Sequence, residues 1–470
     1  MGGRTISQQA FDALVTENMD DLGMDPDEAL QDAIQTLTLQ GVDLSGIIKC
    51  LPGVKNVKDN PVIQSLDELK NIADHLVVSK SDDQRVVTAD KTLDFDKLVV
   101  LLDKLYDLCS VEGSDNASIA TRNGGVELLT SICSLLRVKF EMPLLSALKA
   151  MSSLLHDFQS TETFWHSGGP AILMDILNGS KSSNVLDSGF AVIAAASTGN
   201  EILKEAFIDL KVDELFIQTM REQAKGSMQS LYHAICSLLT PDDNRVLASQ
   251  VYGYARRFAQ IGIADALVDA LREGISSSSL ASACSALKAL AVNDEICKSI
   301  SENGGIDATL KCIDDSSEHN DKIIARACCS LMSKLAGSDA NKNAIVQKGG
   351  LDRLMKLSSR FSEDPSVLQE VMSIVTVLSL RSPENAARAI EAGAGDLAIQ
   401  AMKKFPASYQ MQRQSCLMIR NLVVRNPENR TLLLGNGIEK LIRKAKGSHE
   451  ICKDAATAAL RDLGLNDYNA

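Results

Sequence analysis

The sequence is poor in aromatic residues and has no long apolar run. Aromatic side chains make up 4% of its 470 residues, and Trp165 is the single tryptophan. Aliphatic side chains must therefore fill the core, which favours helices packed on helices. The longest apolar stretches, such as residues 189–197, are far shorter than the roughly 20 residues of a membrane span. Because the first residues also lack the apolar segment of a signal peptide, we expect a soluble protein that is not secreted.

Paired cysteine motifs are also missing. The eleven cysteines have no C-x-x-C spacing, and most lie in apolar helical patterns, which indicates a reducing compartment. We expect a cytoplasmic protein, with the nucleus as a second compartment. His449 and Cys452 have a spacing that metal ligands use, but two ligands without a second pair are typical of coincidence. The neighbouring Cys328 and Cys329 fit core packing better than redox chemistry.

Motifs of the common enzyme classes are absent from the sequence. It contains no P-loop, no dinucleotide-binding glycine motif after a strand, no H-E-x-x-H and no G-x-S-x-G. It also has no strongly basic domain and no aromatic stripe of the kind that binds nucleic acid. We therefore expect a non-enzymatic protein without metal or cofactor, which binds neither nucleic acid nor membrane.

Negative charge is concentrated near the beginning of the chain. Residues 1–120 contain 22 Asp and Glu against 10 Lys and Arg, whereas the remaining residues contain 39 against 38. Of the net charge of −13, −12 therefore belongs to the N-terminal quarter.

A repeat of about 44 residues organises the rest of the chain. Windows such as ATRNGGVELLTSIC (120–133), ISENGGIDATLKCI (300–313) and IVQKGGLDRLMKLS (345–358) align with five others. Their sixth positions fall at residues 125, 169, 211, 262, 305, 350, 394 and 437. The long interval between 211 and 262 predicts an insertion. In each unit a short helix ends at glycines that favour the left-handed conformation, and two further amphipathic helices follow. One unit cannot bury its apolar face alone, so units must stack.

The period, the order of three helices and the Gly-Gly turn resemble the armadillo-repeat family over about residues 115–465. The segment AFDALVTENMDDLGMDPDEALQDAIQTLTLQGVDLSGIIK (10–49) resembles the leader of one branch of that family. The resemblance implies an all-α fold, a right-handed α-solenoid of about eight armadillo repeats behind an N-terminal helical region. It also implies a protein-interaction scaffold that binds partners along the concave face formed by the third helices.

The predicted domains follow from composition and pattern. We expect an acidic helical region at residues 1–78, a polar linker at 79–92, a capping helix at 93–114, the repeat array at 115–465 and a tail at 466–470. Within the first region, Ser7 and Asp25 are placed to cap helices at about 7–22 and 26–40, the second with Pro26 at its first position.

Import receptors of this family bind basic peptides through Trp and Asn residues on their third helices. The corresponding positions here are Lys149/Ser153, His233/Ser237, Lys288/Val292, Ser330/Lys334, Ser373/Val377 and Leu417/Asn421. Asn421 alone matches, and lysines at three positions would repel a basic signal.

Basic residues next to these positions make the second half of the predicted concave face basic. The candidate groove residues are Lys149, Ser153, His233, Ser237, Lys288, Arg326, Ser330, Lys334, Arg413, Arg420 and Asn421. One interpretation is a groove for an acidic, extended partner segment, bound by charge-assisted hydrogen bonds. The other is a solvated helix face that needs charge for solubility.

Three further questions remain open. The acidic N-terminal region either folds back onto the groove and competes with partners, or it is an independent module. The function is either that of a scaffold or that of a transport adaptor that moves a protein between compartments. Trp165 is either an interface anchor or a packed residue between repeats.

Overall fold

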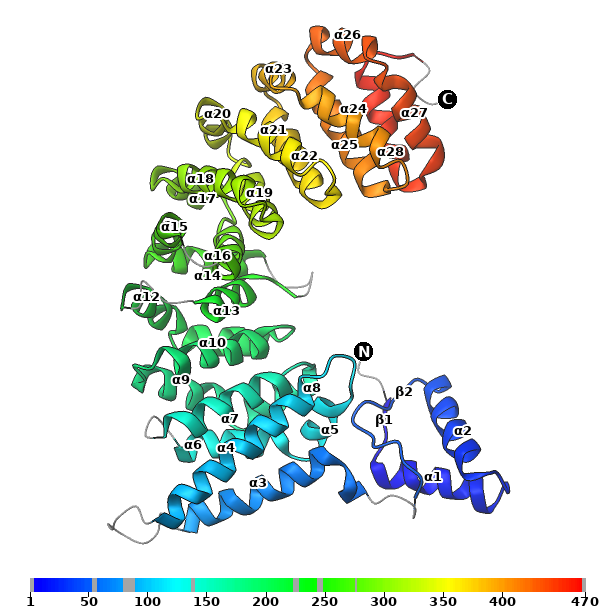
Figure 1. Cartoon of the computed structure of the whole chain (residues 1–470), viewed down its shortest axis with the longest axis vertical. Coiled ribbons are helices and arrows are strands. Elements are labelled where there is room, and N and C mark those ends of the chain that lie inside the picture. Colours follow the sequence, from blue (N-terminus) through cyan, green and yellow to red (C-terminus); the bar gives the residue numbers. More distant parts are fainter. Residues whose placement is uncertain are drawn as a thin grey trace. The chain divides into compact units, whose positions relative to one another are not determined.

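The computed structural model describes residues 4–52, 57–78, 89–136, 140–222, 228–242, 248–274 and 277–466. These ranges are helical almost throughout, which confirms the all-α fold (Figure 1). Their one sheet is a parallel pairing of β1 (Arg4–Thr5) with β2 (Val42–Asp43). The chain divides into unit 1, residues 1–215 and 240–246, and unit 2, residues 216–239 and 247–470.

Eight three-helix repeats follow one another in the described part of the chain. Their first helices are α5 (Asn116–Arg122), α8 (Phe158–His166), α11 (Glu201–Asp209), α14 (Ala248–Gln260), α17 (Asp294–Glu302), α20 (Asp339–Gln347), α23 (Pro383–Glu391) and α26 (Pro427–Gly435). Their second helices are α6 (Gly125–Leu136), α9 (Gly169–Gly179), α12 (Val212–Glu222), α15 (Ile263–Glu273), α18 (Gly305–Glu318), α21 (Gly350–Arg360), α24 (Ala394–Lys404) and α27 (Ile438–Ser448). Their third helices are α7 (Glu141–Leu154), α10 (Ser183–Ser197), α13 (Gln229–Leu239), α16 (Ser277–Leu290), α19 (Lys322–Leu335), α22 (Pro365–Ser379), α25 (Tyr409–Val423) and α28 (Lys453–Asp462), the last preceded by η3 (Glu450–Cys452).

One left-handed residue separates the first and second helices of every repeat. In most repeats it is a glycine, for example Gly124 at φ +80° and Gly349 at φ +74°, as the Gly-Gly pattern predicts. In the third repeat Lys211 takes this place at φ +63°. A side chain with a β-carbon pays about 1 kcal/mol in that conformation. The left-handed residue is the sixth of the aligned window in the third, fourth and eighth repeats and the fifth elsewhere, so the true register differs by one residue from the sequence alignment.

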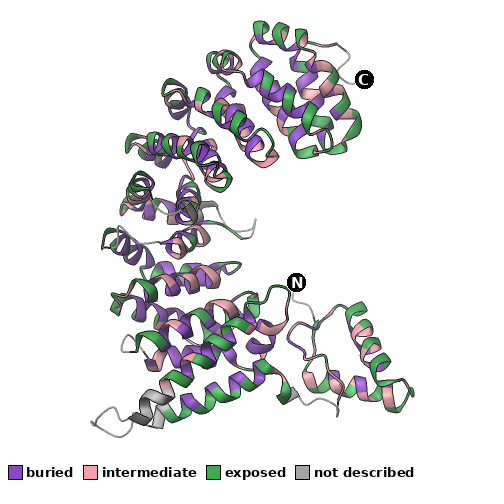
Figure 2. Ribbon diagram, viewed as in Figure 1, coloured by how far each residue is buried: buried purple, intermediate pink, exposed green. Residues whose placement is uncertain are grey.

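Each helix buries one face against the neighbouring repeat. In unit 1, α7 packs against α4 (Ala89–Cys109) and α10, and in unit 2 the third helices from α13 to α28 pack each on the next. Aliphatic side chains such as Leu148, Leu287, Met332 and Val371 fill these contacts. Figure 2 shows the result as buried and exposed stripes on the same helices. The stacking expected from the repeat pattern is therefore present within each unit.

Buried asparagines join consecutive repeats in unit 2. Asn429, third residue of α26, donates its amide to Leu422 O at 2.8 Å and to Ala386 O at 3.2 Å, both in the preceding repeat. Asn341 of α20 does the same with Leu335 O and Cys297 O, each at 3.0 Å. The bonds to Leu335 O and Leu422 O satisfy carbonyls at the end of the preceding third helix, which have no intrahelical donors, and the other two bonds reach the preceding first helix.

The insertion predicted between residues 211 and 262 falls in two places. One is the connection from α13 to α14, and the other is α14 itself, which is longer than the other first helices. The first residues of the insertion fold back onto α11. The side chain of Lys204 is 1% exposed and bonds Thr240 O at 2.6 Å, Glu201 Oε1 at 2.9 Å and the carboxylate of Asp242. Asp242 also accepts the amide of Gly199 at 2.8 Å. This network places residues 240–242 in unit 1.

The first two helices form a small core of their own. α1 (Gln8–Asp20) begins at the N-cap Ser7, and α2 (Pro26–Leu39) begins at the N-cap Asp25, both as predicted. Phe11, Val15, Ala29, Ala33, Leu37, Leu44 and Ile47 are buried together between them. We call residues 4–52 the acidic module, because they contain nine Asp and Glu against two Lys and Arg.

Ion pairs attach the acidic module to the first repeat. Lys49 contacts Asp115 at 2.7 Å, and Arg122 of α5 contacts Asp43 at 3.4 Å. Gly46, at φ +80°, approaches so closely that a β-carbon there would lie 2.6 Å from Arg122 Cδ. The module therefore docks on α5 through a short loop and two charge pairs.

The helices after the acidic module pack on the array. α3 (Pro61–Val78), preceded by η1 (Val57–Asp59), contacts α4, α5 and α6, and α4 lies along α7. Leu98, Leu102 and Leu105 of α4 are fully buried, so this pair covers the first repeat. α4 begins within the predicted linker at 79–92, because Ala89 to Thr92 continue its helix, and residues 79–88 lie outside the described residues. The domain boundaries at 78 and 114 stay predictions.

Candidate protein-binding surface

All eleven candidate residues predicted from the sequence lie within third helices. Lys149 and Ser153 belong to α7 in unit 1, and the other nine belong to unit 2. The lysines, arginines and His233 are exposed, whereas Ser153, Ser237, Ser330 and Asn421 are half-buried. We call the exposed face of α16, α19, α22 and α25 the third-helix surface, and Lys149 and Ser153 are not part of it.

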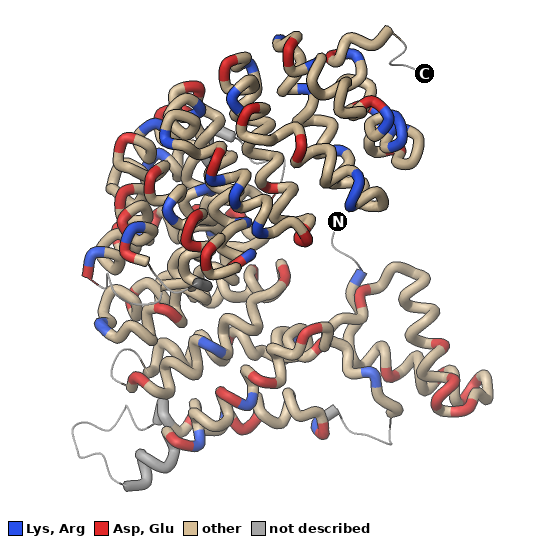
Figure 3. Tube along the Cα trace, turned by 45° about the horizontal axis from the view of Figure 1, so that its top comes forward, with Lys and Arg blue, Asp and Glu red and all other residues tan. Residues whose placement is uncertain are grey.

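Charge on the third-helix surface is almost entirely positive. The four helices carry six basic residues and one acidic residue, Glu370. The basic residues are Lys288, Lys322, Arg326, Lys334, Arg413 and Arg420. Figure 3 shows the distribution of basic and acidic residues along the chain. Such an imbalance attracts carboxylates and repels basic segments.

Side chains connect successive third helices on this surface and at its two ends. His233 Nε2 lies 3.0 Å from Ser282 Oγ, and Lys288 Nζ donates to Ser330 Oγ at 2.7 Å. Farther along, Arg420 Nε contacts the buried Asp462 at 3.2 Å. His233, Lys288 and Arg420 therefore help to hold neighbouring repeats together, which the sequence did not indicate.

Three other cations have no such partner. Among the described residues, Arg326, Lys334 and Arg413 make no ion pair and no hydrogen bond through their charged ends. Arg326 and Lys334 stand on the same helix face of α19, about 12 Å apart along its axis. Their charges are available to a ligand without the loss of an existing contact.

Asn421 has a partner within the chain. Its Nδ2 donates to Thr376 O of α22 at 2.8 Å, and Gln414 donates to the hydroxyl of the same threonine at 3.1 Å. A partner backbone bound by Asn421 would have to replace this bond or use the amide oxygen. Its predicted role in fixing a peptide stays a prediction.

Glu370 is the functional candidate that sequence reasoning missed. It is half-buried on α22, and burial raises the pKa of its carboxyl group, partly offset by Lys288 and Arg326. Its position three residues before Ser373, on the same helix face, could have identified it. When ionised, this carboxylate lowers the positive electrostatic potential that Lys288 and Arg326 produce on the surface.

The other sequence candidates have structural surroundings. His449 Nε2 lies 2.8 Å from Pro406 O, and Cys452 Sγ donates to Tyr409 O at 3.3 Å, so each contacts a different carbonyl. No group of three or more His, Cys, Asp or Glu in the described ranges is arranged to hold a metal ion. Cys328 and Cys329 are fully buried, and Cys328 Sγ lies 3.7 Å from Cys284 Sγ. Trp165 is 40% exposed on α8.

Searched over the same described ranges, no helix is long and apolar enough to cross a membrane.

Comparisons with known proteins agree with the repeat architecture and with the acidic module. Residues 3–75 match the family model of the armadillo repeat-containing protein 6 N-terminal domain. The chain is similar to armadillo repeat-containing protein 6. The orangutan protein of that name, from Pongo abelii, is 26% identical over 439 residues, which cover 91% of this chain and 76% of the relative. The human protein is 26% identical over 440 residues, covering 92% and 76%. The Drosophila melanogaster homolog is 25% identical over 400 residues, covering 83% and 80%.

Solved structures share the fold at lower identity. An engineered protein matches with a TM-score of 0.54 and 16% identity, over 84% of this chain and 99% of its own. A structure from work on a phosphorylation switch in the interaction between cadherin and beta-catenin matches with a TM-score of 0.56 and 14% identity, over 84% and 77%. The resemblance to armadillo repeat-containing protein 6 and the solenoid class of the repeats are therefore confirmed, and the armadillo-repeat fold suggests a protein-interaction scaffold.

Proposed function

We propose that this chain is a non-catalytic scaffold that binds an acidic, extended segment of another protein along the third-helix surface. The observation that carries the proposal is the presence of Arg326, Lys334 and Arg413, exposed and without ion pairs in the described chain, on a surface with one carboxylate. Arginine forms bidentate hydrogen bonds with carboxylates, and an extended segment can cross successive helices.

The surroundings of its nucleophilic and basic side chains favour a scaffold over an enzyme. His233 contacts Ser282, His449 contacts a backbone carbonyl, and burial raises the pKa of the Cys133 and Cys416 thiols to about 12. Such groups contribute to packing and are poor nucleophiles. The proposal includes a cytoplasmic location, with the nucleus as a second compartment. A transport adaptor of the import-receptor type has less support, because this surface would repel a basic signal.

The test is a charge reversal with a matched control. The double variant Arg326→Glu/Lys334→Glu removes two available cations, and Lys311→Glu/Arg388→Glu reverses two exposed cations on a second and a first helix of the same unit, away from this surface. Proximity labelling in cells should lose partners with the first variant and keep them with the second. Two reversed exposed charges should weaken binding by about tenfold. Circular dichroism checks that both variants remain helical. An unchanged set of labelled proteins with the first variant would refute the proposal.

The acidic module offers a second part to this proposal, in which it competes with partners for the third-helix surface. No Lys or Arg occurs between residues 5 and 48, so its two helices are strongly negative. Deleting residues 1–52 removes the module but keeps α3 and α4 on the first repeat. If competition operates, partner affinity rises after the deletion, and an unchanged affinity means that the module acts independently.

A further inference from the structure

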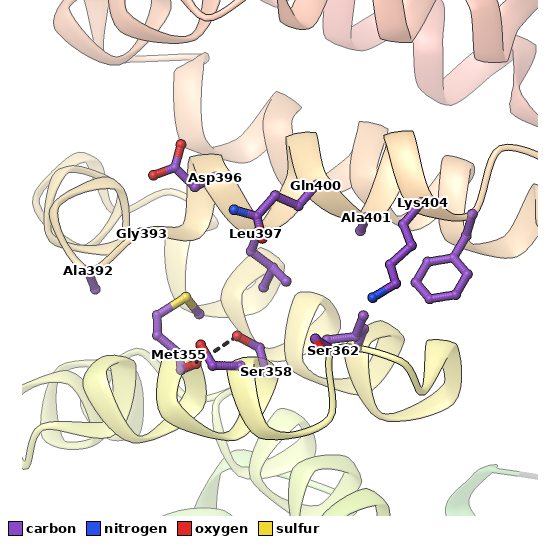
Figure 4. A pocket seen from close by; sticks show the side chains of 13 residues that line it. Met355, Ser358, Ser362, Ala392, Gly393, Asp396, Leu397, Gln400, Ala401 and Lys404 are labelled. Atoms are coloured by element: carbon purple, nitrogen blue, oxygen red, sulfur yellow. Dashed lines mark hydrogen bonds between the residues drawn. The ribbon is translucent and has the colours of Figure 1, made fainter.

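A different face of unit 2, formed by second helices, contains two neighbouring grooves. The first lies between α21 and α24 (Figure 4), has a volume of about 210 Å³ and has apolar lining residues that include Met355, Leu397, Ala401 and Phe405. The second lies between α24 and α27, has a volume of about 170 Å³ and is lined by Met402, Leu441 and Ala445. The two grooves therefore flank one helix, α24.

Small residues keep the first groove open. Ala392 and Gly393 line it just before α24, Ser358 and Ser359 line it from α21, and Ser362 lines it just after α21. In Figure 4, Leu397 points from α24 toward α21, with Ser358 opposite it and Ser362 opposite Lys404. A side chain of the size of leucine could enter this space and contact the apolar lining residues.

Basic residues occur near the two grooves on the C-terminal halves of the helices: Lys404 lines the first groove, and Lys403 and Lys444 line the second. Lys356 and Lys444 occupy the seventh position of α21 and α27, and Lys403 lines the second groove from α24. Lys356, Lys403 and Lys444, together with Arg360 and Lys440, are exposed, and none of these five makes an ion pair among the described residues. This positive charge is distinct from that of the third-helix surface.

Carboxylates occur on this face in places that limit the basic area. Lys404 pairs with Glu363 at one end of the first groove, and Asp396 lines the other end of this groove, seven residues and about 10 Å before Lys403 along α24. The preceding second helix, α18, carries Asp314 and Asp315. The basic area is therefore confined to α21, α24 and α27, near their C-terminal ends.

We propose that the paired grooves on either side of α24 bind an acidic, extended segment of a partner protein, with one apolar side chain in each groove. Packed helices lie about 8–10 Å apart, so the grooves are separated by a similar distance. In an extended polyproline II chain, side chains three residues apart face the same side and are about 9 Å apart. Two apolar residues three positions apart, flanked by carboxylates, match both the spacing and the charge.

Charge complementarity decides between possible occupants. A basic or neutral apolar segment would place no favourable charge opposite Lys356, Lys403 and Lys444, whereas an acidic one places carboxylates at all three. The site does not rest on the proposed function of the third-helix surface, because it uses other helices and requires apolar contacts as well as charge.

The experiment measures fluorescence anisotropy of a labelled acidic peptide with the full chain at low ionic strength. The probe has about ten residues, with two leucines three positions apart, and its matched control carries serines in their place. The leucine probe should bind at least about tenfold more tightly than the serine probe, because each leucine buries apolar surface. Lys403→Glu/Lys444→Glu should weaken the leucine probe by about tenfold. Ser359→Trp, which fills the first groove from its exposed rim, should weaken the leucine probe only.

Two control variants test whether the leucine probe binds at the paired grooves. Lys181→Glu changes an exposed lysine of unit 1 and should not alter binding of the leucine probe. Arg326→Glu/Lys334→Glu removes cations of the third-helix surface, where the proposed function also places acidic segments, so in that variant the leucine probe should keep its advantage over the serine probe. Equal binding of the two probes would overturn the proposal, as would an equal effect of Lys181→Glu. Loss of binding in the third-helix variant would assign the probe to the other surface. The last outcome is a concentration-dependent dimer that dissociates in Lys403→Glu/Lys444→Glu. It would show that a second copy of the chain occupies the grooves, and it would overturn the proposal that a partner segment does.

Discussion

Replacing Lys204 by methionine should destabilise unit 1 considerably. The substitution keeps the length and apolar stem of the side chain but removes the ammonium group that contacts Thr240 O, Glu201 and Asp242. Breaking a fully buried ion pair from one side costs 3–5 kcal/mol, roughly. The two carboxylates here keep 28% and 29% of their side-chain surface exposed, so water compensates part of the loss. We expect a cost of about 2 kcal/mol in the free energy of unfolding.

The equivalent lysine of the sixth repeat provides the control. Lys342 is also the fourth residue of its first helix and is buried, but it pairs at 2.7 Å with Asp339, whose side chain is 89% exposed. Lys342→Met should therefore cost less, about 1 kcal/mol.

Calorimetry and hydrogen exchange together test this difference. For a unit of this size, about 2 kcal/mol corresponds to a fall in melting temperature of roughly 4–8 °C. The amides of Gly199 and Asp242, which donate to carboxylates of the network, should lose protection from exchange in Lys204→Met. Equal melting temperatures for Lys204→Met and the unmodified chain would refute the reasoning, and so would an equal loss in the two methionine variants.

Three further outcomes follow from the structure. Gly46→Ala should loosen the acidic module, by about 2 kcal/mol, because its β-carbon would clash with Arg122 in a left-handed backbone; faster proteolysis within residues 4–52 is the measurement. Burial raises the pKa of the Glu370 carboxyl, so lowering the pH from neutral toward that pKa neutralises the group and makes the third-helix surface more positive. An acidic ligand that is still ionised should then bind more tightly. Glu370→Gln should bind this ligand more tightly at neutral pH, and its affinity, measured across a pH titration, should no longer depend on pH in this way. Iodoacetamide should label Cys50 and Cys236 first, since the other nine cysteines are buried; mass spectrometry of peptides shows the order, and early labelling of a buried thiol would contradict it.

The repeat array could be predicted because its signals are local. The period, the glycines between helices and the caps at Ser7 and Asp25 each depend on a few neighbouring residues, and they remain visible without the fold. The left-handed Lys211 carries no such signal, since the stacked repeats impose its conformation. In the fourth and eighth repeats the register error has another origin: the glycines Gly262 and Gly437 align with the second glycine of the Gly-Gly pairs, whereas the first glycine of those pairs is the left-handed one.

The candidate site was predictable in part. The sequence placed Arg326, Lys334 and Arg413 on third helices because helical spacing fixes the face of each residue. It could not show which cations already have partners, because Lys288 contacts Ser330 and Arg420 contacts Asp462 in the next repeat, each about 42 residues away. The grooves beside α24 depend on the distance between helices, which a single sequence does not encode.

The buried asparagines give the array of unit 2 a direction. Asn341 and Asn429 donate only toward the preceding repeat, and the carbonyls they contact belong to that repeat. A chain shortened from its C-terminal end loses donors together with the repeat that carries them, and the carbonyls left behind can accept water. A chain shortened from its N-terminal side keeps an asparagine whose acceptors have gone. Each repeat is thus specified by the one before it, and such an array can be extended or cut back at its C-terminal end at lower cost than at the other.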